Sequence, residues 1–205
     1  MKNIIFLIAT LLLFSCKKEV KEKNGLDKPK KSSDSLVYSS TALQPHLKFN
    51  SEYSEYELTG LKNSSTFTSK DINFPVKEND FNYNKSNDFD YYTISNFDID
   101  KVHYKIIAYN SYGENDSKVL NVQLNSYISD KQIDALLLDC RFTFETEYYR
   151  LFKIKNNSTI DIKKIAVDSL LYNEEGDIIG KKTVNDTTIE TVQYQIKKTG
   201  HFIKL

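Results

Sequence analysis

The chain is poor in the residues from which compact catalytic motifs are built. Its 205 residues include six glycines, three histidines, two cysteines and no tryptophan. Six glycines leave little room for a phosphate-cradling loop, and the sequence has no Gly-x-Ser-x-Gly elbow. His46, His103 and His201 are too far apart to form a spaced pair of metal ligands. The sequence therefore predicts a protein that is not an enzyme and that holds no metal and no cofactor.

The strongest apolar run in the chain is too short to cross a membrane. It covers the 11 residues 4–14, whereas a membrane-spanning helix needs about 20. Lys2 stands before the run, and the small residue Ser15 follows it. A positive start, a short apolar run and a small residue before a cleavage site are typical of an export signal. We therefore expect residues 1–15 to be a signal peptide.

The run closes on the sequence Leu13-Phe14-Ser15-Cys16. Leu13, Ser15 and Cys16 match the lipobox, so the segment resembles the signal of bacterial lipoproteins. The chain is also rich in Asn, Lys, Tyr and Ile, and in this it resembles a Bacteroidetes-like lipoprotein. The resemblance implies that Cys16 becomes the new N-terminus and is lipidated, with palmitate among its acyl chains. Two or more chains hold a protein stably at a membrane, so the resemblance places this protein in the cell envelope, at the outer membrane, facing the periplasm or the cell surface.

Residues 16–44 are predicted to form a flexible tether, and residues 45–205 a single β-rich domain. Between positions 17 and 31, seven lysines stand beside three acidic residues, with almost nothing apolar to bury. Since the whole chain is formally neutral, the remainder from residue 32 onward carries a net charge of −5. A mildly acidic body argues against a nucleic-acid partner.

The two cysteines are not expected to form a disulfide. If Cys16 is acylated, Cys140 has no partner within the chain. Cys140 lies in the middle of an apolar stripe, where a thiol behaves as a small hydrophobic group. We therefore interpret Cys140 as a buried structural residue and not as a nucleophile.

The clearest strand in the sequence covers residues 135–145. One parity is apolar, from Leu136 to Phe144, and the other is largely charged, which is typical of a half-buried strand. We interpret the charged side chains as its solvated face; they are Asp139, Arg141 and Glu145, with Glu147 just beyond. A less favoured interpretation makes them an acid–base pair of carboxylates in an enzyme.

Further strands are expected along the rest of the chain. They cover residues 102–109, 118–124, 148–155, 159–172, 177–184, 187–197 and 201–205, with turns at 111–117, 156–158, 173–177, 185–186 and 199–200. Closely spaced strands and short turns predict an all-β fold, an antiparallel meander that forms a β-sandwich or an up-and-down barrel. A change of apolar parity within 159–172 predicts a bulge at Lys163–Lys164. Residues 46–100 show no clear period, and Pro75 limits residues 72–76 to an edge strand or none.

Two functional hypotheses follow. The first is a non-catalytic binding or interaction module, anchored to the membrane through lipid, with an unknown envelope protein or glycan as its partner. The chain has 14 tyrosines and 12 phenylalanines, and exposed tyrosines suit either kind of partner. The second is a lipocalin-like carrier that holds a small ligand in a barrel cavity.

Overall fold

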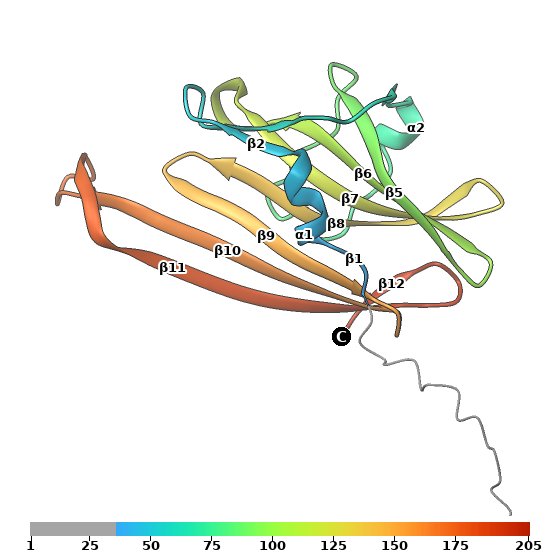
Figure 1. Ribbon diagram of the computed structural model, residues 1–205. Coiled ribbons are helices and arrows are strands. Elements are labelled where there is room, and N and C mark those ends of the chain that lie inside the picture. Colours follow the sequence, from blue (N-terminus) through green and yellow to red (C-terminus); the bar gives the residue numbers. More distant parts are fainter. Residues whose placement is uncertain (1–35) are drawn as a thin grey trace, which may run out of the picture. The chain divides into compact units, whose positions relative to one another are not determined.

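The computed structural model describes residues 36–205 (Figure 1). The expected signal peptide, Cys16 and the lysine-rich part of the tether lie outside these residues. The described elements are β1 Leu36–Ser39, α1 Ser40–Leu43, a 3-10 turn η1 Gln44–His46, β2 Leu47–Asn50, β3 Glu55–Leu58, β4 Ser64–Thr66, α2 Ser69–Ile72, β5 Asp90–Ile99, β6 Val102–Tyr112, a 3-10 turn η2 Glu114–Asp116, β7 Lys118–Ile128, β8 Lys131–Thr143, β9 Thr146–Lys155, β10 Thr159–Tyr172, β11 Ile178–Ile196 and β12 Phe202–Lys204.

Strands β4 to β12 form one antiparallel meander in which each strand pairs with the next along the chain. β1 pairs with β9 outside this order, and β2 and β3 form a separate hairpin. The predicted all-β antiparallel meander is confirmed. The terminal strands β4 and β12 do not pair with each other, so the sheet does not close into a barrel and the sandwich is the arrangement observed.

The meander divides into two layers where β8 meets β9. These two strands are paired at only two positions, Phe142 with Tyr148 and Thr143 with Glu147. β4–β8 form one layer, and β9–β12 form the other (Figure 1). Because so few backbone pairs join the layers, other contacts must hold β8 and β9 in place.

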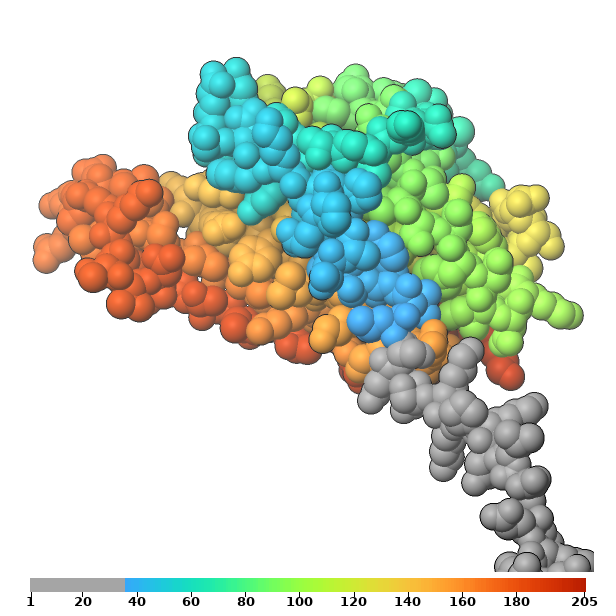
Figure 2. Space-filling model, in the orientation of Figure 1, coloured from blue at the N-terminus to red at the C-terminus, as the bar shows by residue number. Residues whose placement is uncertain are grey.

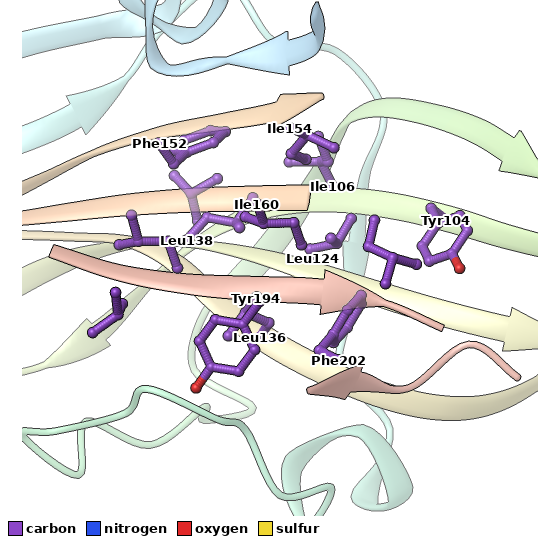
Figure 3. Packing of buried hydrophobic residues seen from close by; sticks show 14 of the residues in the cluster. Tyr104, Ile106, Leu124, Leu136, Leu138, Phe152, Ile154, Ile160, Tyr194 and Phe202 are labelled. Carbon is purple, nitrogen blue, oxygen red and sulfur yellow. The ribbon is translucent and has the colours of Figure 1, made fainter. Parts of the chain in front are cut away.

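The main hydrophobic core fills the space between the two layers (Figure 3). Tyr104 and Leu124 enter it from one layer, and Phe152 and Ile160 enter it from the other. Each fully buried side chain of this size stabilises the fold by about 1.5–3 kcal/mol relative to an exposed one. Within residues 36–205, side chains therefore occupy the space between the layers where a carrier cavity would lie.

The folded domain begins earlier than residue 45. β1 pairs with β9, and Leu43 at the end of α1 is fully buried in the main core. Residues 36–44, expected to belong to the flexible tether, are therefore part of the domain. The short apolar stretch ending at Leu43 has a core to pack against.

The charged side chains of Asp139 and Arg141 in β8 were expected to lie on a solvated face, and this expectation is wrong because both are buried. Asp139 is fully buried and Arg141 is 6% exposed. β8 carries a bulge, because Val122 and Gln123 of β7 face Asp139 and Leu137 with one residue left over. The bulge shifts the alternation, so Leu138 packs in the main core while Cys140 packs in a second hydrophobic cluster. Segments from residues 46–100 cover the surface that the sequence pattern assigned to water.

Cys140 is a free and buried thiol, as expected. It packs against Leu137, Phe142 and Tyr148 in the second hydrophobic cluster. Burial raises the pKa of the thiol to about 12, so the nucleophilic thiolate is absent near neutral pH.

Two expected irregularities differ from the structure. The bulge expected at Lys163–Lys164 is wrong, because β10 keeps one register with β9 from Ile160 to Asp168. Lys164 instead occupies the inward parity of Ile160 and is buried. The turn expected at residues 185–186 is also wrong, because β11 continues through it as one strand.

Candidate functional site

The far end of the β10–β11 hairpin extends beyond the rest of the sheet (Figures 1 and 2). β10 pairs with β9 only as far as Asp168, which faces Thr146. Beyond that point its sole partner is β11. We call residues 169–185 the arm. A tight turn closes it, in which Gly176 adopts φ +89° and its N–H donates to the carbonyl of Asn173.

The turn that was expected at residues 185–186 is instead a bend within β11, at the base of the arm. In the pairing of β10 with β11, Asp168 faces Asp186 and Leu170 faces Lys181, so residues 182–185 lie opposite Ser169 alone. Lys182 Nζ donates to Asp168 Oδ2 at 2.6 Å and to Asp186 Oδ2 at 2.8 Å. Asn and Asp are favoured in bulges and turns alike, so local sequence could not distinguish them.

The arm exposes a group of apolar side chains. Four large ones are between 44% and 79% exposed: Leu171, Ile178, Ile179 and Val184. The outer edge of β11 is paired only at residues 194–196, by β12. Among the described residues, no strand pairs with that edge from 178 to 192. An unpaired edge combined with exposed apolar residues is a template for another chain.

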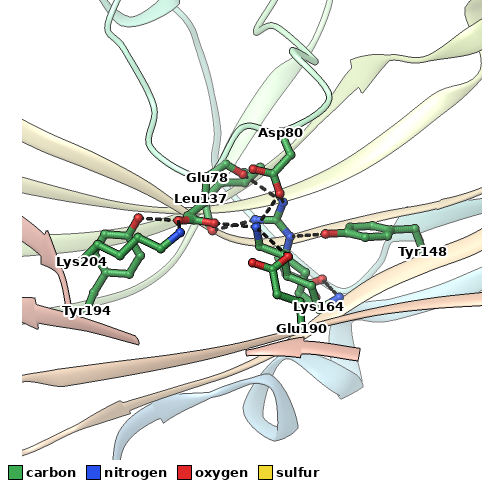
Figure 4. A network of polar contacts seen from close by, with 10 residues as sticks. Glu78, Asp80, Leu137, Tyr148, Lys164, Glu190, Tyr194 and Lys204 are labelled. Carbon is green, nitrogen blue, oxygen red and sulfur yellow. Dashed lines mark hydrogen bonds and ion pairs between the residues drawn. The ribbon is translucent and has the colours of Figure 1, made fainter. Parts of the chain in front are cut away.

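A network of charged side chains forms a second candidate site, and it includes Glu78 and Asp80 of the segment that follows α2 (Figure 4). Glu78 accepts hydrogen bonds from Lys164, Lys204 and the Tyr194 hydroxyl. Lys164 also pairs with Asp80 at 2.6 Å and with Glu190 at 3.8 Å. The network links the segment after α2 to β10, β11 and β12. A hollow of about 190 Å³ lies beside it.

Arg150 is the most deeply buried charge of this network. Its side chain is fully buried and donates to four oxygens: the Tyr148 hydroxyl at 3.1 Å, the Leu137 carbonyl at 3.2 Å, the Glu78 carbonyl at 2.9 Å and Asp80 Oδ2 at 3.2 Å. The planar guanidinium presents several donors in fixed directions, so it can bond to two strands and a loop together.

The protonation states of the network suit a structural role. Burial alone would raise the pKa of Glu78, but its hydrogen bonds to Lys164, Tyr194 and Lys204 outweigh burial and lower it to about 2. Burial likewise opposes the charge of Lys164, yet bonds to Asp80 and Glu78 hold the pKa of the amine above its ordinary value. Both groups stay charged near neutral pH, whereas a general acid or base needs a pKa close to the working pH.

The structure gives separate environments to the carboxylates of the less favoured acid–base interpretation. Asp139 accepts from Arg141 Nε at 2.7 Å and from the backbone N–H of Arg150 at 2.8 Å. Burial raises the pKa of Asp139, and the adjacent Arg141 opposes that shift. Glu145 is exposed and bonds to Tyr172, while Glu147 accepts from the Tyr56 hydroxyl.

The three histidines are also separate. His103 is exposed and bonds to Asp98 at 2.8 Å. His46 contacts the Thr59 carbonyl, and His201 lies 3.6 Å from Asp134. Within residues 36–205, no group of three or more His, Cys, Asp or Glu side chains could hold a metal ion. Over the same residues, no helix is long and apolar enough to cross a membrane.

Sequence reasoning missed Glu78, Asp80, Lys164 and Arg150. One signal was available for Lys164, since it continues the inward parity of Ile160 and Ile162. The two acids come from a segment without periodicity, so no local pattern could assign them to the network.

Glu78 should make the stability of the domain depend on acid. Its folded pKa is lower than its ordinary value of 4.5, so the stabilisation it provides is complete above pH 4.5 and is lost as the pH falls toward 2. Between those values, the free energy of unfolding should fall by about 2 kcal/mol more in the parent protein than in Glu78→Gln. Urea titrations at several pH values measure the difference.

The matched control is Glu175→Gln, which changes an exposed turn residue of the arm. It should follow the parent curve at every pH. Parallel curves for the parent and Glu78→Gln would show that the network does not hold Glu78 ionised.

Comparison with known proteins assigns no family to this chain. No family model, no curated protein and no solved structure matches it. The arm and the charged network therefore have to be interpreted from their own chemistry.

Proposed function

We propose that this protein is a non-catalytic binding module of a bacterial cell envelope, lipidated at Cys16 and anchored at the outer membrane. Its partner is an envelope protein that contacts the arm. The observation that carries the proposal is the set of exposed apolar side chains on a projecting hairpin with an unpaired edge. The charged network supports the same proposal as a structural element, because it fixes the base from which the arm extends.

The chemistry of the arm favours a protein over a glycan as the partner. An exposed strand edge can accept a further strand through main-chain hydrogen bonds, and neighbouring apolar residues then become buried. Ile178, Ile179 and Val184 supply such apolar area. Glycans are usually bound by flat aromatic rings, and Tyr172 is the arm's one aromatic residue.

The lipocalin-like carrier is not supported by a cavity of the expected kind. The terminal strands β4 and β12 do not pair with each other, so the sheet stays open. Buried residues from both layers fill the space between the two layers (Figure 3). A binding module that uses its surface is therefore the hypothesis we retain.

Cys16→Ser should abolish incorporation of labelled palmitate into the protein. The lipobox resemblance makes Cys16 the only acylated thiol, so its loss removes the attachment site. Metabolic labelling of cells followed by immunoprecipitation measures the effect. Cys140→Ala is the control and should keep the label, because Cys140 is buried. Retained label in Cys16→Ser would refute the anchor.

A photo-reactive residue in place of Ile179 should crosslink to one specific envelope protein in intact cells. Ile179 is 60% exposed, so the substitution should change the free energy of unfolding by less than about 0.5 kcal/mol. The control position is Tyr53, which is 63% exposed between β2 and β3. Mass spectrometry identifies the crosslinked protein. The same proteins captured from both positions, or none captured from the arm, would contradict the proposal.

A further inference from the structure

A pocket of about 580 Å³ is lined mainly by residues 72–85, and none of its lining residues belongs to the arm or to the charged network. Its volume is within the range of small-molecule sites. The lining is mostly polar, and the side chains that matter here are Asn82, Asn84, Tyr83 and Lys85. Such a lining suits a ligand with hydroxyl groups better than an apolar one.

Lys85 is a buried cation without an anionic partner in this pocket. It is 7% exposed, and its one hydrogen bond runs from Nζ to the carbonyl of Phe74 at 3.4 Å. None of the ion pairs of residues 36–205 includes it; Asp71 is the acid whose charge acts on it, without reaching it. Lys164, buried to the same extent, pairs with three carboxylates.

Physical chemistry makes an unpaired buried ammonium group unfavourable unless something compensates it. Burial lowers the pKa of Lys85 to about 8, so the amine still carries its proton at neutral pH. An ammonium group has three N–H donors, and Phe74 accepts one of them. The remaining donors can serve a negatively charged ligand group in the pocket.

Neighbouring side chains offer further contacts to such a ligand. Among the described residues, neither the side-chain amide of Asn82 nor that of Asn84 is hydrogen-bonded to another protein group, and each can both donate and accept. The Tyr83 ring stacks on Phe81 with the planes 17° apart, which fixes its position at the pocket. Amides bond to hydroxyl groups, and a fixed aromatic ring can pack against a sugar ring.

We propose that this pocket binds an anionic sugar. The carboxylate or phosphate of the sugar pairs with the Lys85 ammonium group, and its hydroxyl groups bond to Asn82 and Asn84. The site uses residues outside the arm, so it does not depend on the proposed protein partner.

Calorimetric titration of the full-length protein tests the site with three probes at millimolar concentration. They are glucuronate, which supplies a carboxylate, glucose 6-phosphate, which supplies a phosphate, and glucose, which is neutral. At least one anionic sugar should bind at least ten times more tightly than glucose. Which of the two binds identifies the anion that the pocket prefers.

Substitutions connect the binding to Lys85. Lys85→Met keeps an unbranched side chain of nearly the same length but removes the charge, and should weaken binding of the anionic sugar at least tenfold. Lys70→Met changes an exposed lysine of α2 and should leave the affinity unchanged. Asn82→Ala should weaken binding severalfold, because one amide contact is lost.

A stability measurement distinguishes a ligand site from a structural lysine. Lys85→Met should melt at the same temperature as the parent protein or higher, because it replaces an unpaired buried charge with an apolar side chain. Three results would overturn the proposal: no binding of either anionic sugar, equal binding of glucose, or unchanged affinity in Lys85→Met. Failure of the arm to crosslink would leave this site unaffected.

Discussion

The fold depends on the hydrogen bonds that Arg150 and Asp139 make where β8 and β9 separate. After two backbone pairs, the strands diverge into different layers, and their backbone groups lose the partners that a continuous ladder would supply. Buried backbone groups without partners are costly. Asp139 accepts the backbone N–H of Arg150, and the Arg150 side chain donates to the carbonyl of Leu137. Each strand thus supplies a side chain for the backbone of the other.

The same guanidinium also fixes the segment that follows α2. Arg150 donates to the carbonyl of Glu78, and Lys77 makes two backbone bonds to β8, through the Ala135 carbonyl and the Leu137 N–H. Residue 77 therefore occupies part of the gap between the diverging strands. Glu78 then lies where Lys164, Tyr194 and Lys204 can reach it (Figure 4). Removing one partner of such a buried network is costly, because it leaves the other charges uncompensated.

This arrangement separates the body of the sheet, which the charged network cross-links, from an exposed arm. The charged network joins β9–β12 up to the last pair with β9 at Asp168. Beyond it, the arm is held by β10–β11 pairing and by the contacts of Lys182 with Asp168 and Asp186. Among the described residues, no hydrophobic cluster includes the exposed apolar side chains of the arm, and our proposal is that a partner protein buries them. The anchor at Cys16 lies outside the described residues and stays a prediction.

Local pattern predicted much of the fold. The expected bounds of residues 159–172 are those of β10, and the turn at 173–177 lies where it was expected. Local pattern failed where distant segments decide burial. Alternation predicts a solvated face for Asp139. The prediction fails because segments from residues 46–100, which have no readable period, cover that face in the fold. The parity change at Lys163–Lys164 predicts a bulge, but Lys164 faces inward because it pairs with Glu78 and Asp80, which lie more than 80 positions away in the chain.

The most direct test of this account is hydrogen exchange in Arg150→Met, with Lys153→Met, an exposed change on the same strand, as the control. Losing the guanidinium leaves the carbonyls of Leu137 and Glu78 without their Arg150 donor, while Asp139 keeps the backbone N–H of residue 150. We expect faster exchange in residues 77–83 and near Leu137, and a fall of about 3–5 kcal/mol in the free energy of unfolding. Lys153→Met should match the parent protein in both respects. Parent-like protection and stability in Arg150→Met would contradict the claim that Arg150 holds the two layers and the loop together.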